Sequence, residues 1–124
     1  MVTQSSIPQT QNNDIDPKLM EFLRDKVNTF VRWDLIRFFH DNPHAMDTAE
    51  NIAHYTGRDV QSVEAELVGL ADAKVLQIQP SRKQKIFSLS ADPTIRDLVN
   101  RFVLACDDRQ FRINAINQVI RGLR

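Results

Sequence analysis

The chain has 124 residues, a formal net charge of zero and a pI near 6.8, with 42% hydrophobic and 26% charged residues. This is the composition of an ordinary globular protein, and its length predicts one domain with one hydrophobic core. Zero net charge excludes attraction to nucleic acid through overall charge, so any such binding requires a local basic patch.

The first 15 residues are rich in Gln, Asn, Ser and Thr. They predict a disordered tail, because they offer too few apolar groups to offset the entropy lost on ordering. They also lack the apolar stretch of a signal peptide, and the chain has no apolar run of about 20 residues. One cysteine, Cys106, excludes an intrachain disulfide and fits a reducing compartment. We therefore expect a cytoplasmic protein that does not contact a membrane.

An apolar pattern with helical spacing comes next. Asp16-Pro17 has the residue types of a helix N-cap and first helical residue. Apolar side chains then follow at steps of three and four as far as Phe39, and Asn42-Pro43 ends the pattern. The stretch predicts either one long helix or two helices with a bend near Asn28-Thr29.

Residues 47–90 predict two helices followed by a β-hairpin. Asp47–Glu50 has the pattern of a capping box, Gly57 ends the short helix that it begins, and Asp59 caps the next helix. The predicted buried row of that helix is Val60, Val63, Leu67 and Leu70. Residues 75–79 and 85–90 alternate apolar and polar side chains around the basic loop "PSRKQ", which predicts the hairpin.

A final helix is predicted from Asp92-Pro93 to the end of the chain. Its apolar row follows alternating steps of four and three, interrupted by Arg109, which is the pattern of a coiled-coil seam. We expect the first half to pack on its own domain. The second half is expected to pair with a second copy, together with the helix over residues 19–30. The predicted dimer residues are Ile113, Ile116, Ile120 and Leu123. The alternative is a helix that folds back on its own monomer.

Three segments carry a resemblance. Ile52-Ala53-x-x-x-Gly57 has the spacing of a helix-turn-helix, Leu67-x-x-Leu70-x-x-Ala73-Lys74-Val75 matches the end of a recognition helix, and "SRKQKIFSLS" matches a second wing strand. In this order the chain resembles the winged helix-turn-helix regulators of bacteria, the ArsR-, MarR- and PadR-like group. The resemblance implies a mostly α-helical fold with a small β-hairpin: a winged helix-turn-helix domain over residues 16–92, with an extra N-terminal helix, and a long C-terminal dimerisation helix over residues 93–124.

The chain departs from that family in two places. Lys74 stands where a Gly is usual, and a left-handed backbone there costs about 1 kcal/mol. Glu64, Ala65 and Glu66 stand where the family often has a polar group that contacts phosphate. A helical wheel places Gln61, Ser62, Ala65, Val68, Gly69 and Asp72 on the outward face, and Glu64 and Glu66 on its two flanks.

The resemblance implies a homodimeric, sequence-specific transcriptional regulator whose partner is double-stranded DNA. The residues expected to contact DNA are Arg58, Gln61, Ser62, Ala65, Arg82, Lys83 and Lys85. The first helical turn would approach base edges, and the basic loop would approach phosphates. The alternative is a winged helix that binds protein instead, through the small side chains at Ala65, Val68 and Gly69.

The sequence was also searched for a metal site, an effector pocket, a reactive thiol and catalytic residues. His40, His44 and Asp47 raise the idea of a metal site, but Pro43 breaks the helix between the two histidines, so we expect no metal. The aromatic group Phe30, Trp33, Phe38 and Phe39 is expected in the core, and an effector pocket is the alternative. Cys106 is expected to be a small core residue, with a reactive thiol as the alternative. No catalytic set or phosphate loop is present, so neither an enzyme nor a cofactor is expected.

Overall fold

The structure is a computed structural model that describes residues 16–81 and 83–122. The tail predicted over residues 1–15, Arg82 of the predicted DNA contacts and Leu123 of the predicted dimer row lie outside the described residues. The elements in chain order are α1 (Pro17–Lys26), α2 (Phe30–Asp41), β1 (Met46–Asp47), α3 (Ala49–Thr56), α4 (Val60–Asp72), β2 (Leu76–Pro80), β3 (Lys85–Leu89), α5 (Pro93–Ala105) and α6 (Arg109–Gly122). The expected mixture of many helices and a small β-hairpin is confirmed.

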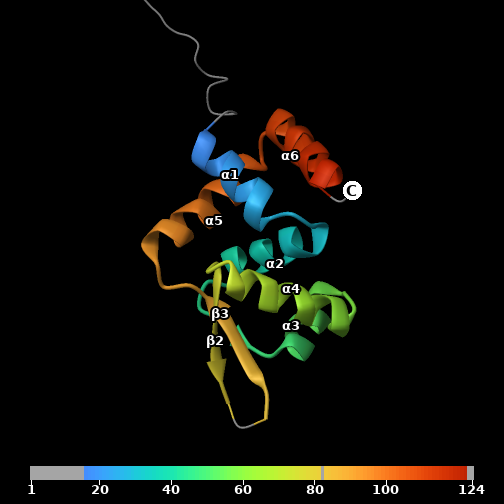
Figure 1. The fold of residues 1–124 in the computed structure, drawn as a ribbon, viewed down its shortest axis with the longest axis vertical. Helices are drawn as coiled ribbons and strands as arrows, with labels where there is room; N and C mark the ends of the chain where they lie inside the picture. Colours follow the sequence, from blue (N-terminus) through green and yellow to red (C-terminus); the bar gives the residue numbers. More distant parts are fainter. Residues whose placement is uncertain (1–15, 82, 123–124) are drawn as a thin grey trace, which may run out of the picture.

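The apolar stretch before residue 43 forms two helices. Asp16 caps α1 by accepting a hydrogen bond from Lys18 N at 3.0 Å, as the sequence predicts. A new cap, Thr29, accepts from Arg32 N at 3.0 Å and starts α2. The bend between them lets α1 turn away from the line of α2 (Figure 1). Of the two predicted alternatives, the bent pair is the one observed.

The two helices after β1 are joined by a tight turn. Thr48 caps α3, and Gly57 ends it in the left-handed region with φ 70°. Arg58 N then donates to Ala53 O at 3.1 Å, and Asp59 caps α4 by accepting from Ser62 N at 3.0 Å. The predicted roles of Gly57 and Asp59 are thus confirmed.

The sheet has three antiparallel strands in the order β1-β3-β2. The predicted hairpin is β2 paired with β3, in a register that sets Leu76 opposite Leu89. In Figure 1 the hairpin extends beyond the helices, at the end of the molecule opposite α1 and α6. β1 was not predicted, and it pairs with the middle of β3 through Met46 and Asp47. Two residues are too few for an alternating pattern to be recognised.

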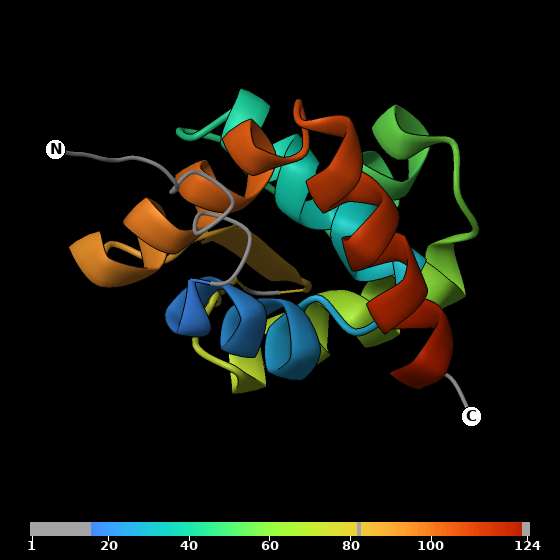
Figure 2. The same ribbon diagram turned by 90° about the horizontal axis from the view of Figure 1, so that it is seen from above.

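The single C-terminal helix predicted over residues 93–124 is wrong, because the chain turns between α5 and α6. Asp108 accepts a hydrogen bond from Phe111 N at 2.8 Å, which caps α6. The guanidinium of Arg112 reaches back to Cys106 O at 2.7 Å and holds the corner. α6 then runs back over the molecule and packs against α1 (Figure 2).

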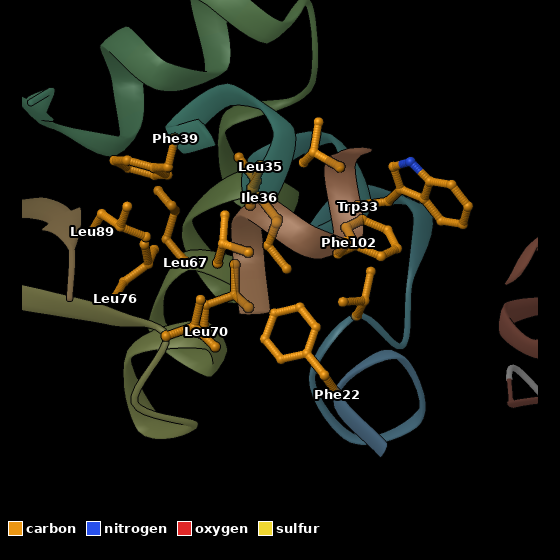
Figure 3. Close-up of a cluster of buried hydrophobic side chains, with 14 of the residues drawn as sticks. Phe22, Trp33, Leu35, Ile36, Phe39, Leu67, Leu70, Leu76, Leu89 and Phe102 are labelled. Atoms are coloured by element: carbon orange, nitrogen blue, oxygen red, sulfur yellow. The ribbon is translucent and has the colours of Figure 1, made fainter. Parts of the chain in front are cut away.

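One buried apolar cluster joins the helices to the sheet. Figure 3 shows Phe22 of α1, Trp33 of α2 and Phe102 of α5 side by side, and the rings of Trp33 and Phe102 meet edge to face with centroids 5.2 Å apart. Leu67 and Leu70 of α4 lie in the same cluster. Within the described residues, no helix has both the length and the apolar character needed to cross a membrane.

Candidate functional site

The orientation of α4 is set by its buried row. Val63, Leu67 and Leu70 have no exposed surface, as predicted. Val60, the predicted fourth member, is 40% exposed. It lies in the first turn of α4, beside the hairpin, where the core does not reach it. The remaining row still fixes which side of α4 faces solvent.

The outward face of α4 is small and neutral in its first half. Gln61, Ser62 and Ala65 are all exposed, which matches the predicted outward face. The second half differs from the prediction, because the guanidinium of Arg32 lies directly against the backbone at Gly69. A side chain at Gly69 would collide with Arg32, so this part of the predicted small face is not open to a partner.

The acidic residues of α4 and of its N-cap lie in three different environments. Asp59 is used as the cap of its own helix. Glu66 accepts a hydrogen bond from Arg32 Nε at 2.7 Å, and the two side chains are only 26% and 15% exposed. Glu64 and Asp72 remain exposed. The negative charge on the solvent side of α4 is therefore smaller than its sequence suggests.

Arg58 lies in a different environment from the one predicted. Its Nη2 is 2.6 Å from Asp34 Oδ2, and its Nε donates to the same oxygen at 2.7 Å. A cation expected to contact phosphate is thus paired with a carboxylate of α2. Neither partner is separated from solvent, so this pair can still exchange for a phosphate group.

A groove of about 420 Å³ separates the hairpin from the helices. We call it the hairpin groove. It is lined by Thr48, Ala49, Glu50, Val60, Glu64, Lys83, Gln84, Lys85 and Phe87. Lys83 and Lys85 stand on the hairpin side, and Glu50 and Glu64 stand on the helix side. Among the described residues, neither lysine has a carboxylate within 4 Å, so both charges are available to a ligand.

Of the predicted dimer residues, Ile113 and Ile120 lie on the outer side of α6, whereas Ile116 is half-buried and packs against the core of its own monomer. The helix packs on its own molecule through Phe111, Ala115 and Val119, which are almost fully buried. Ile113 and Ile120 are 41% and 51% exposed. At 100° per residue the two rows lie on nearly opposite sides of the helix. One face of α6 therefore packs as the alternative prediction expected, with the helix folded back on its own monomer. On the opposite face, Ile113 and Ile120 remain exposed in the monomer.

His40 and Cys106 are explained by contacts within the fold. His40 Nε2 lies 3.1 Å from Asn100 Oδ1 of α5, whereas His44 is exposed in the turn after α2. Among the described residues, no group of three or more His, Cys, Asp or Glu is placed to hold a metal ion. Cys106 is buried, and its burial raises the pKa of the thiol to about 11. At neutral pH it therefore remains a protonated, unreactive thiol.

Contacts between residues far apart in the chain were not predicted from the sequence. The Arg32–Glu66 pair joins positions 34 residues apart, and no local pattern indicates it. The cap at Asp108 did carry a signal, because an aspartate three residues before Phe111 has the spacing of a helix N-cap.

Comparisons with protein-family models, with curated proteins and with solved structures found no match.

Proposed function

We propose that residues 30–89 form a winged helix-turn-helix that binds double-stranded DNA. Support comes from the element order: helix, short strand, two helices joined by a left-handed glycine turn, then a hairpin that pairs with the short strand. In such a module the second helix of the pair enters the major groove and the hairpin reaches the adjacent backbone. α4 is the recognition helix, and the β2–β3 hairpin is the wing.

One observation carries the proposal. The first half of α4 and the hairpin lysines Lys83 and Lys85 stand on opposite sides of one groove, the hairpin groove, to which α4 contributes Val60 and Glu64. Gln61 and Ser62 have side chains that hydrogen-bond to base edges, and Ala65 lets the backbone approach closely. Lys83 and Lys85 contact phosphates beside them. The pairing of Glu66 with Arg32 removes one carboxylate charge from this surface.

The test is the salt dependence of binding to a random-sequence duplex, measured by fluorescence anisotropy. Each phosphate contact adds about 0.9 to the slope of log K against log salt concentration. The Lys83→Ala/Lys85→Ala variant should lower that slope by nearly two and weaken binding to all sequences alike. The matched control, Lys18→Ala/Arg24→Ala, removes two charges from α1 at the far end of the molecule (Figure 1) and should leave the slope unchanged. An unchanged slope in the hairpin variant contradicts the role of the wing.

A second candidate function is protein binding by the same module without DNA. The specific observation in its favour is that Arg58 and Arg32 are both paired with carboxylates of the chain. The partner would contact Ala65 and the exposed first turn of α4. Retention on heparin or on random duplex at low salt separates the two functions, because a protein-binding module with these paired cations is not retained.

We also propose that the protein forms a homodimer through the outer side of α6. Ile113 and Ile120 stand one heptad apart on the side that the monomer leaves exposed, and the half-buried Ile116 lies at the edge between that side and the core. Sedimentation equilibrium should show a mass that rises with concentration from 14.3 kDa toward twice that value. Ile113→Gln/Ile120→Gln should remain monomeric, whereas Met46→Gln/Tyr55→Gln, which removes exposed apolar side chains elsewhere, should still dimerise. A wild-type monomer at all concentrations contradicts the dimer.

A further inference from the structure

A second hollow lies beside β1, between α2 and α3, and it shares no lining residue with the hairpin groove. Its volume is about 540 Å³, which is within the range of ligand sites. We call it the β1-edge groove. It is lined by Phe38, Asn42, Ala45, Met46, Asp47 and Tyr55.

Apolar side chains are exposed to water in this groove. Tyr55 is 65% exposed and Met46 is 56% exposed. The ring of Tyr55 stacks on Phe38 with an interplanar angle of 14° and centroids 6.0 Å apart, which gives the groove a flat aromatic wall. Three such side chains around one hollow form a contiguous apolar surface, and covering it is favourable.

The hydrogen-bond ladder of the hairpin shows which backbone groups face β1. Ser81 N donates to Gln84 O at 3.1 Å, and Ser90 N donates to Val75 O at 3.0 Å. Residues of an antiparallel strand point their N–H and C=O groups to alternate sides. Every second residue of β3, Ser88 included, therefore directs its backbone groups at β2.

The alternate residues of β3 direct their backbone groups at β1 instead of β2. Phe87 directs its N–H and C=O groups at β1, where its partner is Asp47. The backbone groups of Asp47 are thus used in the sheet, and those of Met46 point away from β3. β1 is an edge strand, and within the described part of the chain no backbone group pairs with the N–H or C=O of Met46, so Met46 presents a donor and an acceptor beside the apolar groove.

The charge of the groove selects its occupant. Asp47 lines it, and the Asp47 carboxylate is held in place because Oδ1 accepts from Thr48 N at 2.8 Å and from Asn51 Nδ2 at 2.7 Å. No Lys or Arg is among the described residues that line the groove. A cationic side chain is complementary to this rim, and an acidic one is repelled.

We propose that the β1-edge groove binds an extended peptide segment of another protein, which adds to the sheet at Met46. One apolar side chain of the peptide enters against Phe38 and Tyr55, and a neighbouring Lys or Arg pairs with Asp47. Strand addition supplies the main-chain hydrogen bonds, and the aromatic wall and the carboxylate supply the selectivity. This site is separate from the proposed DNA surface, so its occupation does not depend on DNA binding.

The test is an NMR titration of the full-length, ¹⁵N-labelled protein with a capped seven-residue peptide of alternating Lys and Leu. Saturable shifts are expected at the amides of Met46, Asp47 and Tyr55. Two N-methylated forms of the peptide, one methylated at every Leu and one at every Lys, should differ in affinity by about three- to tenfold, because only one set of amides faces β1. An alternating Glu and Leu peptide should bind more weakly than the Lys form.

Tyr55→Ala should reduce the affinity of the Lys peptide, and the matched control Leu104→Ala, which truncates an exposed apolar residue on α5, should not. Equal affinity of the two methylated peptides, or shifts gathered on α6 instead of β1, would overturn the proposal. A wild-type dimer that dissociates on Tyr55→Ala would identify a second copy as the occupant, and this also overturns it.

Discussion

At the scale of single residues, the partner of Glu66 decides the charge of the surface that α4 presents. Without Arg32, the carboxylate would stand at the edge of a face that we propose to lie against phosphates. The guanidinium reaches it only because Gly69 leaves space for the Arg32 side chain to cross α4. One glycine, one arginine and one glutamate thus form a unit, although they come from two helices.

This unit predicts an energetic coupling between Arg32 and Glu66. Both side chains are largely covered, so a double-mutant cycle of Arg32→Gln and Glu66→Gln should give a coupling of about 1–2 kcal/mol in the free energy of unfolding. In duplex binding, Arg32→Gln should weaken affinity and Glu66→Gln should strengthen it. A coupling near zero by urea denaturation would show that the pair is not formed in solution.

We predict that replacing Lys74 by glycine stabilises the folded protein. Its φ of 70° lies in the left-handed region, which costs a non-glycine residue about 1–2 kcal/mol. Glycine avoids this strain, but part of the benefit is lost because glycine gives the unfolded chain more conformational entropy. Lys74→Gly should therefore raise the free energy of unfolding by about 0.5–1 kcal/mol. The reverse change, Gly57→Ala, meets no neighbouring atom, so its expected loss of about 1 kcal/mol comes from backbone strain alone. Urea denaturation of the two variants measures both, and a loss of stability in Lys74→Gly would contradict the argument.

At the scale of elements, the corner between α5 and α6 determines the shape of the C-terminal region. α5 buries Ile95, Val99 and Phe102, which belong to the predicted row. After the corner the buried side chains are Phe111, Ala115 and Val119, while Ile113 and Ile120 of the predicted row lie on the outer face. Ile113 and Ile120 are therefore exposed because the chain changes direction at the corner, and not because the residue types change.

The corner predicts unequal effects of its two aspartates. Asp108→Ala removes the cap of α6 and should lower the free energy of unfolding by about 1 kcal/mol. Asp107 is exposed, and Asp107→Ala should change it by less than about 0.5 kcal/mol. Urea denaturation followed by circular dichroism measures both variants. Equal effects would mean that Asp108 does not cap the helix in solution.

The sequence predicted those elements whose periodicity is local. α4 and the hairpin follow from the spacing of their apolar residues, which the core enforces. β1 is too short to show a period, and the corner was hidden because the steps of four and three continue across residues 106–109. Of the candidate site, Gln61, Ser62 and Lys83 are exposed as expected, but the partners of Arg58 and Arg32 required the tertiary structure.

At the scale of the whole molecule, three surfaces are separate. The proposed DNA surface lies on α4 and the hairpin, the proposed dimer surface lies on α6, and the β1-edge groove is lined by residues of α2, β1 and α3 and the turn after α2. Figure 1 shows the hairpin and α6 at opposite ends of the molecule, so substitutions on α6 lie far from the hairpin. Changes at one surface should therefore leave the other two able to bind.

This separation predicts how pairing of the chain changes DNA binding. A symmetric dimer places two recognition helices on one duplex and doubles the number of phosphate contacts. The monomeric Ile113→Gln/Ile120→Gln variant should therefore show about half the wild-type salt slope on a 30-base-pair duplex. It should equal the wild type on a duplex too short for two subunits. A half slope with unchanged affinity on the short duplex supports both proposals, because the substitutions lie outside the DNA surface. A variant that is monomeric but retains the full slope would show that one subunit makes every phosphate contact, and that the α6 pair has no part in DNA binding.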